Sequence, residues 1–498
     1  MADILGSATG RLPFPDTVLL AGIYIVVFAL CLVARPKVSS RSWQQLLLLA
    51  GSYAVYLAWA SWFAAVLAFS TVANFLVGRM LRRNGSRLTL ALGVLLNLAL
   101  LGSFKYLPPL AIAVPFTSLQ RFAHLALPLG ISFWTFQAMS YLFDLYRGEE
   151  LYPTFVEFAL YMCFFPIAIS GPICRLPEML PQFRSKNAFD WNSVGRGLAR
   201  VAMGLLMMQL ARLLGQGISA GDGLNGGFDH MRQWSGLDVW CLAFGYGLQL
   251  FFDFAGYSHI AIGAALALGF TLPENFARPF ASTSPSVFWT RWHMSLSFWI
   301  RDYVFLPLAM MRREYWWRTM LLVVSMVLFG LWHKATILFL LWGLCQGALL
   351  VLHRQIQQLE YRFNWMPPTR LWEAFGWITT MCSISLGWIL FRANSLSQAK
   401  QMFAAVLQPG SYFEHFLSGS LYVLILMLAL GYGAVIVVVD VINRHASDHD
   451  AKASFVVTIA RHRWYWVPAL YLLTLFLVLM VTLSQNSGGS AQLMYRGF

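Results

Sequence analysis

The sequence predicts an all-α polytopic membrane protein, and its composition is the first observation that points to that class. Of the 498 residues, 58% are hydrophobic and only 11% are charged, and the mean hydropathy is +0.62. An ordinary soluble domain has about a quarter of its residues charged. The 39 Phe, 20 Trp, 19 Tyr and 20 Met residues must therefore face lipid or pack between membrane helices. This composition excludes a soluble enzyme, a disordered chain and a collagen-like repeat.

The second observation is the length of the apolar runs, which predict roughly ten to twelve crossings at about 20 residues each. The first run, 17–33, is followed by arginines and has no small-residue cleavage site, so it predicts a retained helix rather than a signal peptide. The later runs are 44–78, long enough for a helical hairpin, and then 88–104, 122–145, 155–173, 199–215, 237–270, 317–332, 335–352, 375–391, 420–440 and 464–483. Without an inverted repeat or a Gly/Ser linker, the sequence predicts one membrane domain over residues 1–498.

The third observation is the distribution of charge. The 35 Lys and Arg exceed the 21 Asp and Glu, giving a net charge of +14. Nucleic-acid binding is one explanation of a basic chain, but here the basic residues form short clusters between apolar runs, as the positive-inside rule describes. We therefore expect a lipid bilayer and no nucleic acid as partner, with both chain ends outside. The loops expected to be cytoplasmic are 35–41, 79–87, 353–363 and 440–463.

Several kinds of active site have no signature in the sequence. The six cysteines lack the CxxC spacing of a zinc site, and no GxSxG, HExxH or Walker A motif occurs. We therefore expect no bound metal or cofactor.

Polar residues inside apolar runs are costly and mark candidate sites. Gln249, Asp253 and Tyr257 follow one another at i, i+4 and i+8, so a helix places them on one face. They either form a hydrogen-bonded strip between helices or line a functional cavity. His333 and Lys334 are the only basic or acidic side chains between Met320 and Leu350. His333 is either a hydrogen-bonded packing residue or a general base, since an imidazole can take a proton from a hydroxyl near neutral pH.

Segment 273–303 is too polar to span the membrane and too apolar for a free loop, so it predicts short interfacial or re-entrant helices. Its charged side chains either anchor the protein among lipid headgroups or hold an anionic ligand such as a coenzyme pyrophosphate. These side chains are Arg278, Arg291, His293, Arg301 and Asp302. Arg392, which closes a later span, is predicted to extend from its helix end toward water.

At these residues the sequence resembles the membrane-bound O-acyltransferase family, in its bacterial branch of alginate O-acetyltransferases and teichoic acid D-alanyl transfer proteins. The resemblance extends over about 42–407. Its motifs are LLGSFKY (100–106), LPLGISFWTFQAMSYLFDLYRG (127–148), FFPIAISGPICR (164–175), LQLFFDFAGYS (248–258), LPENFARPF (272–280), FWTRWHMSLSFWIRDY (288–303), FGLWH (329–333) and GWILFRANSLSQA (387–399).

The resemblance implies transmembrane helices around a central funnel and a catalytic pair, His333 after Trp332 and His293 after Trp292. His333 would be the base and then the acid. The expected donor- and substrate-binding residues are Arg291, Arg301, Asp302, Asn275, Gln249, Asp253, Tyr257 and Trp332. An acyl group, expected to be acetyl, would pass from a cytoplasmic thioester, either acetyl-CoA or an acylated carrier protein, to an extracytoplasmic polysaccharide. The alternative is D-alanyl transfer to a cell-envelope polymer.

The acceptor would be the polymer itself or a periplasmic or extracellular acyltransferase partner, and the location a bacterial inner membrane. The chain departs from the family pattern at Lys334, where Gly is usual, and at Gln346, where a His is usual. His259 stands where the alginate branch often has an acid, and AMMRREY from Ala309 replaces that branch's Gly-Gly-Asn. Rival hypotheses are a transporter of a polysaccharide or lipid intermediate, and a membrane scaffold whose polar residues only join helices.

Overall fold

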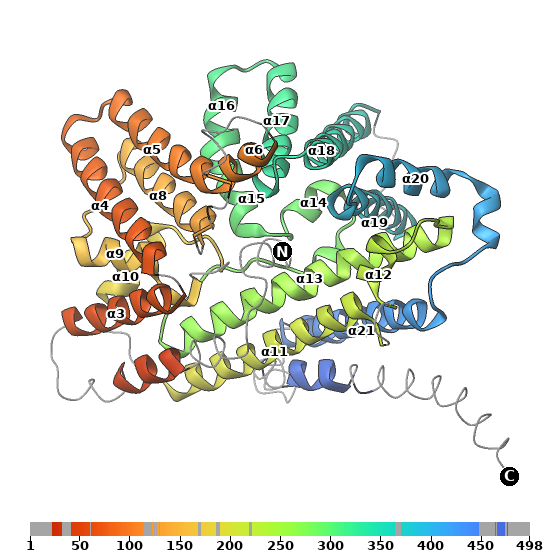
Figure 1. Cartoon of the computed structure of the whole chain (residues 1–498), viewed down its shortest axis with the longest axis horizontal. Coiled ribbons are helices and arrows are strands. Elements are labelled where there is room, and N and C mark those ends of the chain that lie inside the picture. Colours follow the sequence, from red (N-terminus) through yellow and green to blue (C-terminus); the bar gives the residue numbers. More distant parts are fainter. Residues whose placement is uncertain are drawn as a thin grey trace, which may run out of the picture. The chain divides into compact units, whose positions relative to one another are not determined.

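The predicted all-α class is confirmed in a computed structural model. It describes residues 22–31, 41–59, 61–113, 122–123, 125, 127–128, 130–167, 171–185, 190–218, 222–363, 370–447, 464, 466–473 and 476. Within these ranges the regular structure is helical, without strands (Figure 1).

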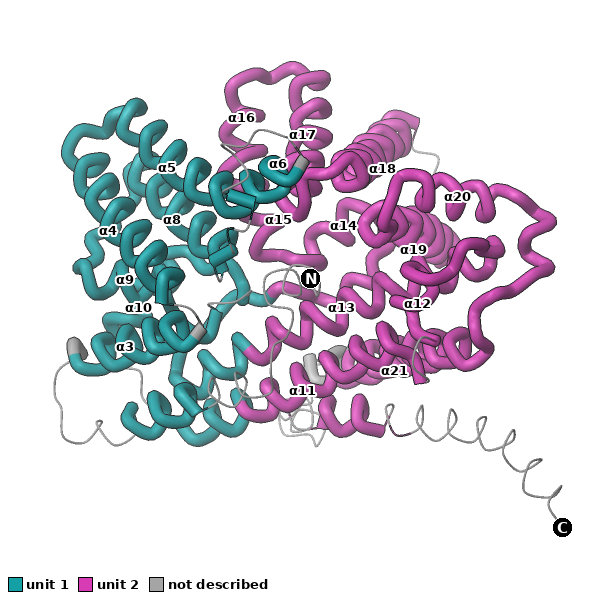
Figure 2. Tube along the Cα trace, viewed as in Figure 1, with its two compact units in different colours: residues 1–197, 261–274 teal, residues 198–260, 275–498 magenta. Residues whose placement is uncertain are grey.

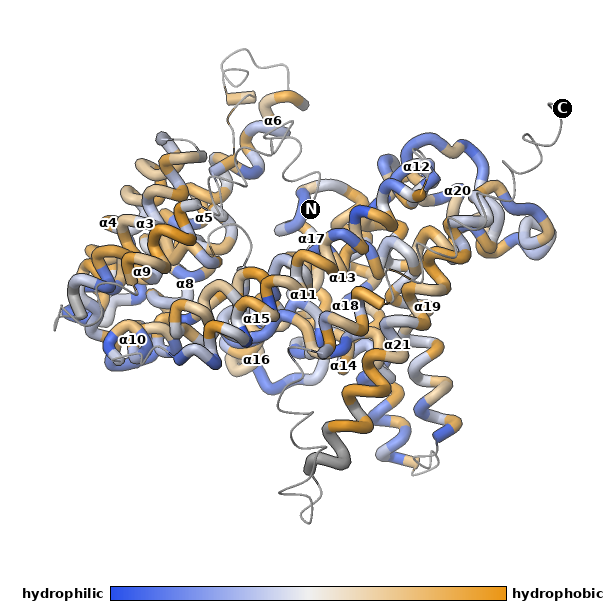
Figure 3. Tube along the Cα trace, turned by 90° about the horizontal axis from the view of Figure 1, so that it is seen from below, coloured by the Kyte–Doolittle hydropathy of each residue, from blue (hydrophilic) through white to orange (hydrophobic). Residues whose placement is uncertain are grey.

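The described residues include eight helices long and apolar enough to cross a membrane, so the protein is a multi-pass membrane protein. They are α4 (Ser61–Asn84), α5 (Arg87–Lys105), α11 (Trp191–Gln216), α13 (Gly236–Ala267), α17 (Tyr315–His333), α18 (Ile337–Phe363), α19 (Arg370–Arg392) and α21 (Gly419–Ser447). Figure 3 colours α21 as hydrophobic along most of its length and the chain around α12 (Leu224–Asp229) as hydrophilic.

Eight is fewer than the ten to twelve crossings predicted, and proline explains two of the differences. The run 122–145 forms α8 (Ile131–Tyr146) only after Pro128, and the run 155–173 forms α9 (Phe155–Cys163) and a 3-10 turn that contains Pro166. Proline cannot donate a backbone hydrogen bond and interrupts a helix. Of the run 17–33 the structure describes 22–31, a helix too short to count as a span, and of the run 464–483 it describes 464, 466–473 and 476.

The chain divides into two compact units, residues 1–197 with 261–274 and residues 198–260 with 275–498 (Figure 2). In unit 1, α3 (Arg41–Trp59) and α4 form the predicted hairpin and pack with α5, α8 and α9. Buried Asn74 and Asn97 join α4 to α5 by two side-chain hydrogen bonds of 2.6 and 3.2 Å. Unit 1 also contains α6 (Leu107–Ala113) and α10 (Leu176–Arg184). The prediction of one membrane domain stays a prediction.

Unit 2 confirms the short helices predicted for 273–303. They are α14 (Pro285–Trp289), α15 (Met294–Ile300) and the π-helical η3 (Arg301–Phe305), which continues into α16 (Leu306–Met311). Outside the spanning helices, unit 2 also has α12, α20 (Leu396–Leu407) and the 3-10 helix η4 (Pro409–Phe413).

A buried carboxylate joins the beginnings of α13 and α21. Asp238, fully buried, caps α13 by exchanging hydrogen bonds with Ser235. Its Oδ1 also accepts hydrogen bonds from the Leu417 backbone N–H at 3.2 Å and from the hydroxyl of Tyr422 on α21. Burial of this charge is offset by hydrogen bonds from two separate elements.

Glycines allow α17 and α18 to lie in direct backbone contact. A Cβ on Gly343 of α18 would come within 2.6 Å of the Met326 carbonyl oxygen of α17, and one on Gly347 within 2.8 Å of Val323 Cα. This small-xxx-small spacing brings helix backbones together in membranes, where dispersion contacts replace the hydrophobic effect. The contact fixes the C-terminal end of α17, where His333 lies.

Gly343→Ala should therefore destabilise the protein by about 1–3 kcal/mol, because the added methyl group meets backbone atoms that cannot move alone. The measurement is the thermal transition of purified protein in detergent. Gly433→Ala is the matched control, since nothing lies within 4 Å of a Cβ at that position of α21. Equal transition temperatures for the two variants would show that the α17–α18 contact is not tight.

Candidate active site

His333 is the last residue of α17 and lies among aromatic rings. The Phe329 ring, one turn earlier, stacks on the imidazole with centroids 5.2 Å apart, and the Phe391 ring of α19 meets it edge-on at 5.0 Å. Trp332 and Trp342 lie at 4.7 and 6.0 Å. The side chain is half-buried rather than enclosed. Aromatic surroundings with partial exposure suit a base that must meet a substrate away from bulk water.

His293 approaches the same aromatic residues. Its ring is 6.2 Å from Phe329 and 6.4 Å from Trp332, and the edge of Phe254 on α13 lies 4.6 Å away. The structure thus brings the two predicted histidines to two shared neighbours, Phe329 and Trp332. Unlike His333, His293 is only 3% exposed.

The backbone of His293 is held in an unusual conformation. Its φ is +44°, in the left-handed region that residues with a side chain rarely adopt, as is that of Arg278 at +54°. Such strain persists only where surrounding contacts maintain it, and it concentrates at functional sites. Here the Met294 N–H donates to the Asn275 carbonyl at 2.9 Å and the Ala277 N–H to the Arg291 carbonyl at 3.0 Å. These two bonds join the backbone of residues 275–277 to that of residues 291–294.

Asn275 fastens this turn to α13. The side chain is fully buried; its Nδ2 donates to Ser258 Oγ at 3.0 Å, and its Oδ1 accepts from Ser295 Oγ at 2.6 Å. Since the amide is used by these protein partners, its geometry suits a residue that positions His293 more than one that binds a donor.

Several buried polar atoms around the histidines lack a protein partner in the described part of the chain. They are His293 Nδ1, the indole nitrogens of Trp289, Trp342 and Trp388, and Gln346 Oε1. Buried indole N–H groups usually find a partner. Gln346, which replaces the usual histidine, is 1% exposed, and its amide nitrogen occupies the space left by the missing side chain of Gly387. Of these residues, Trp342 lies nearest to His333 in the ring contacts, with centroids 6.0 Å apart.

The predicted anion-binding residues are engaged with the protein. Arg291 donates from Nη1 to the Ala281 carbonyl at 3.1 Å. Arg301 pairs with its neighbour Asp302, Nε to Oδ1, at 2.6 Å and lies over the Phe298 ring at 4.7 Å. Because Arg301 and Asp302 neutralise each other, the positive charge available for an anionic donor is smaller than the sequence suggests.

Gln249 and Asp253, two of the three polar residues predicted to share one face of α13, lie toward α11. A Cβ on Gly215 of α11 would come within 2.5 Å of the Gln249 amide nitrogen, and Asp253 lies in the electrostatic range of Arg212 on α11. Tyr257 is half-buried on the same helix. The α13 residues that approach the histidine turn are instead Phe254 and Ser258. A direct role for Gln249, Asp253 and Tyr257 stays a prediction.

His259 on α13 acts as a neutral acceptor. Its Nδ1 accepts a 3.1 Å hydrogen bond from Nε of buried Arg200 on α11, and the Arg200 guanidinium lies 4.6 Å from the Trp464 ring. A neutral imidazole nitrogen accepts a hydrogen bond as the acid expected at this position would, but it carries no negative charge.

Arg392 corrects an expectation. Its side chain does not extend toward water; it is 12% exposed and pairs with Asp229 of α12 at 2.8 Å. Burial alone would raise the pKa of Asp229, but hydrogen bonds from Arg392 and Asn394 outweigh it and lower the pKa below its usual value. No local pattern marked Asp229 as a partner, because it lies 163 residues before Arg392.

Sequence reasoning also missed Phe329, Trp342 and Phe391 as neighbours of His333. Phe329 carried a signal, since it precedes His333 by four residues and so shares its helix face. Trp342 and Phe391 carried none, because they come from α18 and α19.

Comparison with known proteins places this fold and site in a class. Residues 46–395 match the model of the membrane-bound O-acyltransferase family. The chain is 32% identical over 409 residues to a probable alginate O-acetylase of Azotobacter vinelandii, covering 79% of this chain and 78% of that protein. It is 30% identical to a peptidoglycan O-acetyltransferase of Helicobacter pylori, covering 71% and 72% of the two chains. It is 29% identical to a teichoic acid D-alanyltransferase of Streptococcus thermophilus, covering 53% and 68%.

The protein is therefore a membrane enzyme that transfers acyl groups. It belongs to the membrane-bound O-acyltransferase family, which implies an acyl donor.

The burial of His293 gives a test at acidic pH. Burial lowers the pKa of His293 to about 3, so the folded protein keeps this imidazole neutral while the unfolded chain takes up a proton below about pH 6.5. Since the unfolded state then binds more protons, the free energy of unfolding should fall as pH drops from about 6.5 toward 3.

His293→Gln should accordingly flatten the fall of the thermal transition temperature between pH 7.5 and 5 in detergent. The matched control is His415→Gln, which removes an exposed imidazole. If His293→Gln and wild type lose the same number of degrees, His293 is not a buried neutral group.

Proposed function

We propose that the protein moves an acetyl group from a cytoplasmic thioester to a hydroxyl of an extracytoplasmic polysaccharide, with His333 as the general base. The observation that carries this is the contrast between the two histidines. His333 is half-buried, whereas His293 is enclosed and shares its aromatic neighbours Phe329 and Trp332.

In the proposed reaction a ring nitrogen of His333 takes the proton from the acceptor hydroxyl as its oxygen attacks the thioester carbonyl. The new C–O bond forms, the C–S bond breaks, and the imidazolium returns the proton to the departing thiolate. A thioester is already activated, so the enzyme has to align the reactants, accept one proton and exclude water. The rings of Phe329, Trp332 and Phe391 supply the apolar surroundings.

His293 is assigned a positioning role in this proposal. Its neutral, enclosed imidazole contacts Phe254, Phe329 and Trp332. Nδ1, which has no hydrogen-bond partner among the described residues, would hydrogen-bond the acyl donor or a bound water. Asn275 would act with His293 by holding the strained turn against α13.

His333→Ala should reduce acyl transfer by about 10²–10⁴-fold, the usual contribution of a positioned acid–base group. Transfer is measured as thiol release from the donor by purified protein in nanodiscs. His415→Ala, an exposed histidine, is the control for loss of an imidazole. A His333→Ala variant that folds and transfers normally would contradict the assignment.

The acetyl group is favoured by the relatives. The alginate and peptidoglycan relatives are named for acetylation and cover more of this chain than the D-alanyltransferase relative does. All are bacterial, which supports a bacterial inner membrane as the location, and the acceptor would be a polysaccharide reached directly or through a periplasmic or extracellular acyltransferase partner.

The donor is tested by supplying labelled acetyl-CoA and an acylated carrier protein in separate assays, each with a polysaccharide as the acceptor. We expect thiol release from acetyl-CoA in wild type and none above background in His333→Ala. Release from the carrier protein alone would favour the D-alanyl alternative instead. Movement of a polymer across the membrane without thiol release would favour the transporter hypothesis.

A further inference from the structure

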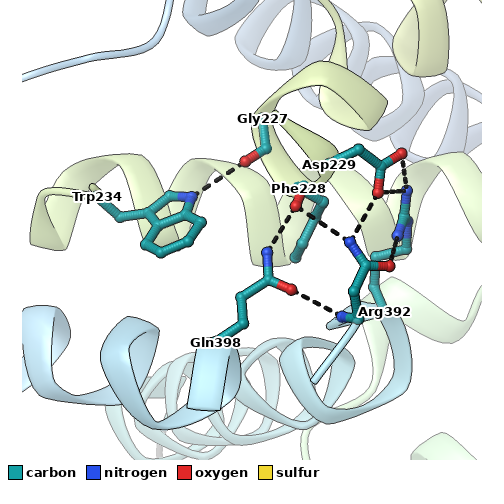
Figure 4. Close-up of polar contacts among 7 residues, drawn as sticks. Gly227, Phe228, Asp229, Trp234, Arg392 and Gln398 are labelled. Carbon is teal, nitrogen blue, oxygen red and sulfur yellow. Dashed lines mark hydrogen bonds and ion pairs between the residues drawn. The ribbon is translucent and has the colours of Figure 1, made fainter. Parts of the chain in front are cut away.

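A group of polar side chains joins α12 to the end of α19 (Figure 4). Nη2 of Arg392 donates to both carboxylate oxygens of Asp229, at 2.9 and 2.8 Å. Nδ2 of Asn394 donates to Asp229 Oδ1 at 2.9 Å, and Oε1 of Gln398 accepts from the Asn394 backbone N–H at 2.7 Å. We call Asp229, Arg392, Asn394 and Gln398 the α12–α19 latch.

The latch and Trp234 also satisfy the end of α12. The last carbonyl groups of a helix have no partner within it. Here Gln398 Nε2 donates to the Phe228 carbonyl at 2.6 Å, and the Trp234 indole donates to the Gly227 carbonyl at 3.0 Å. Such a short helix is held in place by these side chains from other segments, because it has few hydrogen bonds of its own.

From the latch, ring contacts lead to the candidate base. The Arg392 guanidinium lies 5.2 Å from the Phe228 ring, Phe228 is 5.9 Å from Tyr246 of α13, and Tyr246 is 6.5 Å from Phe391. Phe391 precedes Arg392 on α19, and its ring touches His333 edge-on at 5.0 Å. The backbone that carries Arg392 therefore also carries a wall of the His333 site.

We propose that Asp229 and Arg392 are positioning residues for acyl transfer, which hold Phe391 against the imidazole of His333. This inference rests on the proposed function, in which His333 is the base. α19 ends at Arg392, and a helix end without tertiary contacts frays. The ion pair prevents fraying of the last turn of α19, which contains Phe391. Small displacements of a reacting group lower rates steeply.

The burial of the pair distinguishes positioning from simple stabilisation. The Asp229 side chain is 37% exposed and the Arg392 side chain 12%, so water reaches the pair from the Asp229 side and it contributes less to stability than a fully buried pair would. Loss of the pair should consequently change the turnover rate more than the amount of folded protein.

The test is a double-mutant cycle on kcat for thiol release, with Arg392→Ala, Phe391→Leu and the double variant. Arg392→Ala should lower kcat by about tenfold or more, with the KM for the donor unchanged, since alignment and not donor binding is affected. If Arg392 acts through Phe391, the double variant should be no slower than Phe391→Leu alone, because effects through a shared contact are not additive. Arg392→Lys, which retains the charge, should recover much of the rate.

Asp229→Asn gives a second variant should Phe391→Leu not fold, and it should reproduce the kcat loss of Arg392→Ala. Arg184→Ala is the matched control: it removes an ion pair with Glu157 at 2.9 Å in unit 1 and should leave kcat unchanged. Each rate is normalised to folded protein from gel filtration.

Three results would overturn the proposal. The first is a double variant whose kcat loss equals the product of the losses of Arg392→Ala and Phe391→Leu. The others are an Arg392→Ala variant that changes only the KM for the donor, and a fall in rate that matches the fall in folded protein. The proposed function fails separately, through a His333→Ala variant that remains active. An inactive His333→Ala with a fully active Arg392→Ala removes only the latch proposal.

Discussion

The close contact between α17 and α18 is the constraint on which the candidate site depends. Gly343 and Gly347 let the two backbones touch, and α17 ends three residues after Gly330, which lies against Phe339 and Trp342 of α18. His333 is thereby placed next to side chains from both helices. In a membrane, where lipid is as apolar as a leucine side chain, such a contact depends on shape rather than on expulsion of water.

Two different devices hold the two histidines. His293 lies in a strained turn that Asn275 fastens to Ser258 and Ser295, so a fully buried amide network fixes it. His333 is at a helix end and is fixed by surrounding rings, one of which, Phe391, depends on the neighbouring Arg392. A buried network tolerates little movement, whereas His333 is only half-buried among its neighbouring rings. This difference supports the division of roles between a positioning histidine and a base.

Two positions at which the sequence departs from the expected family pattern hold hydrogen-bonding groups. His259 accepts a hydrogen bond from Arg200, and Gln346 supplies a buried amide. Both positions lie in the interior of unit 2, where an added or lost charge costs more than a changed hydrogen-bond acceptor.

Composition and local pattern determined the membrane class, most helix positions and the short helices of 273–303, because hydropathy and helical spacing act over neighbouring residues. They also marked His333 and the segment that contains His293 as candidate sites, and the family resemblance added Trp332; the roles of these residues stay predictions. Only the tertiary structure decided that Arg392 meets Asp229, that Phe391 and Trp342 enclose His333, and that Gln249 and Asp253 lie toward α11. These relations join helices far apart in sequence, and their geometry depends on backbone packing that no single segment encodes.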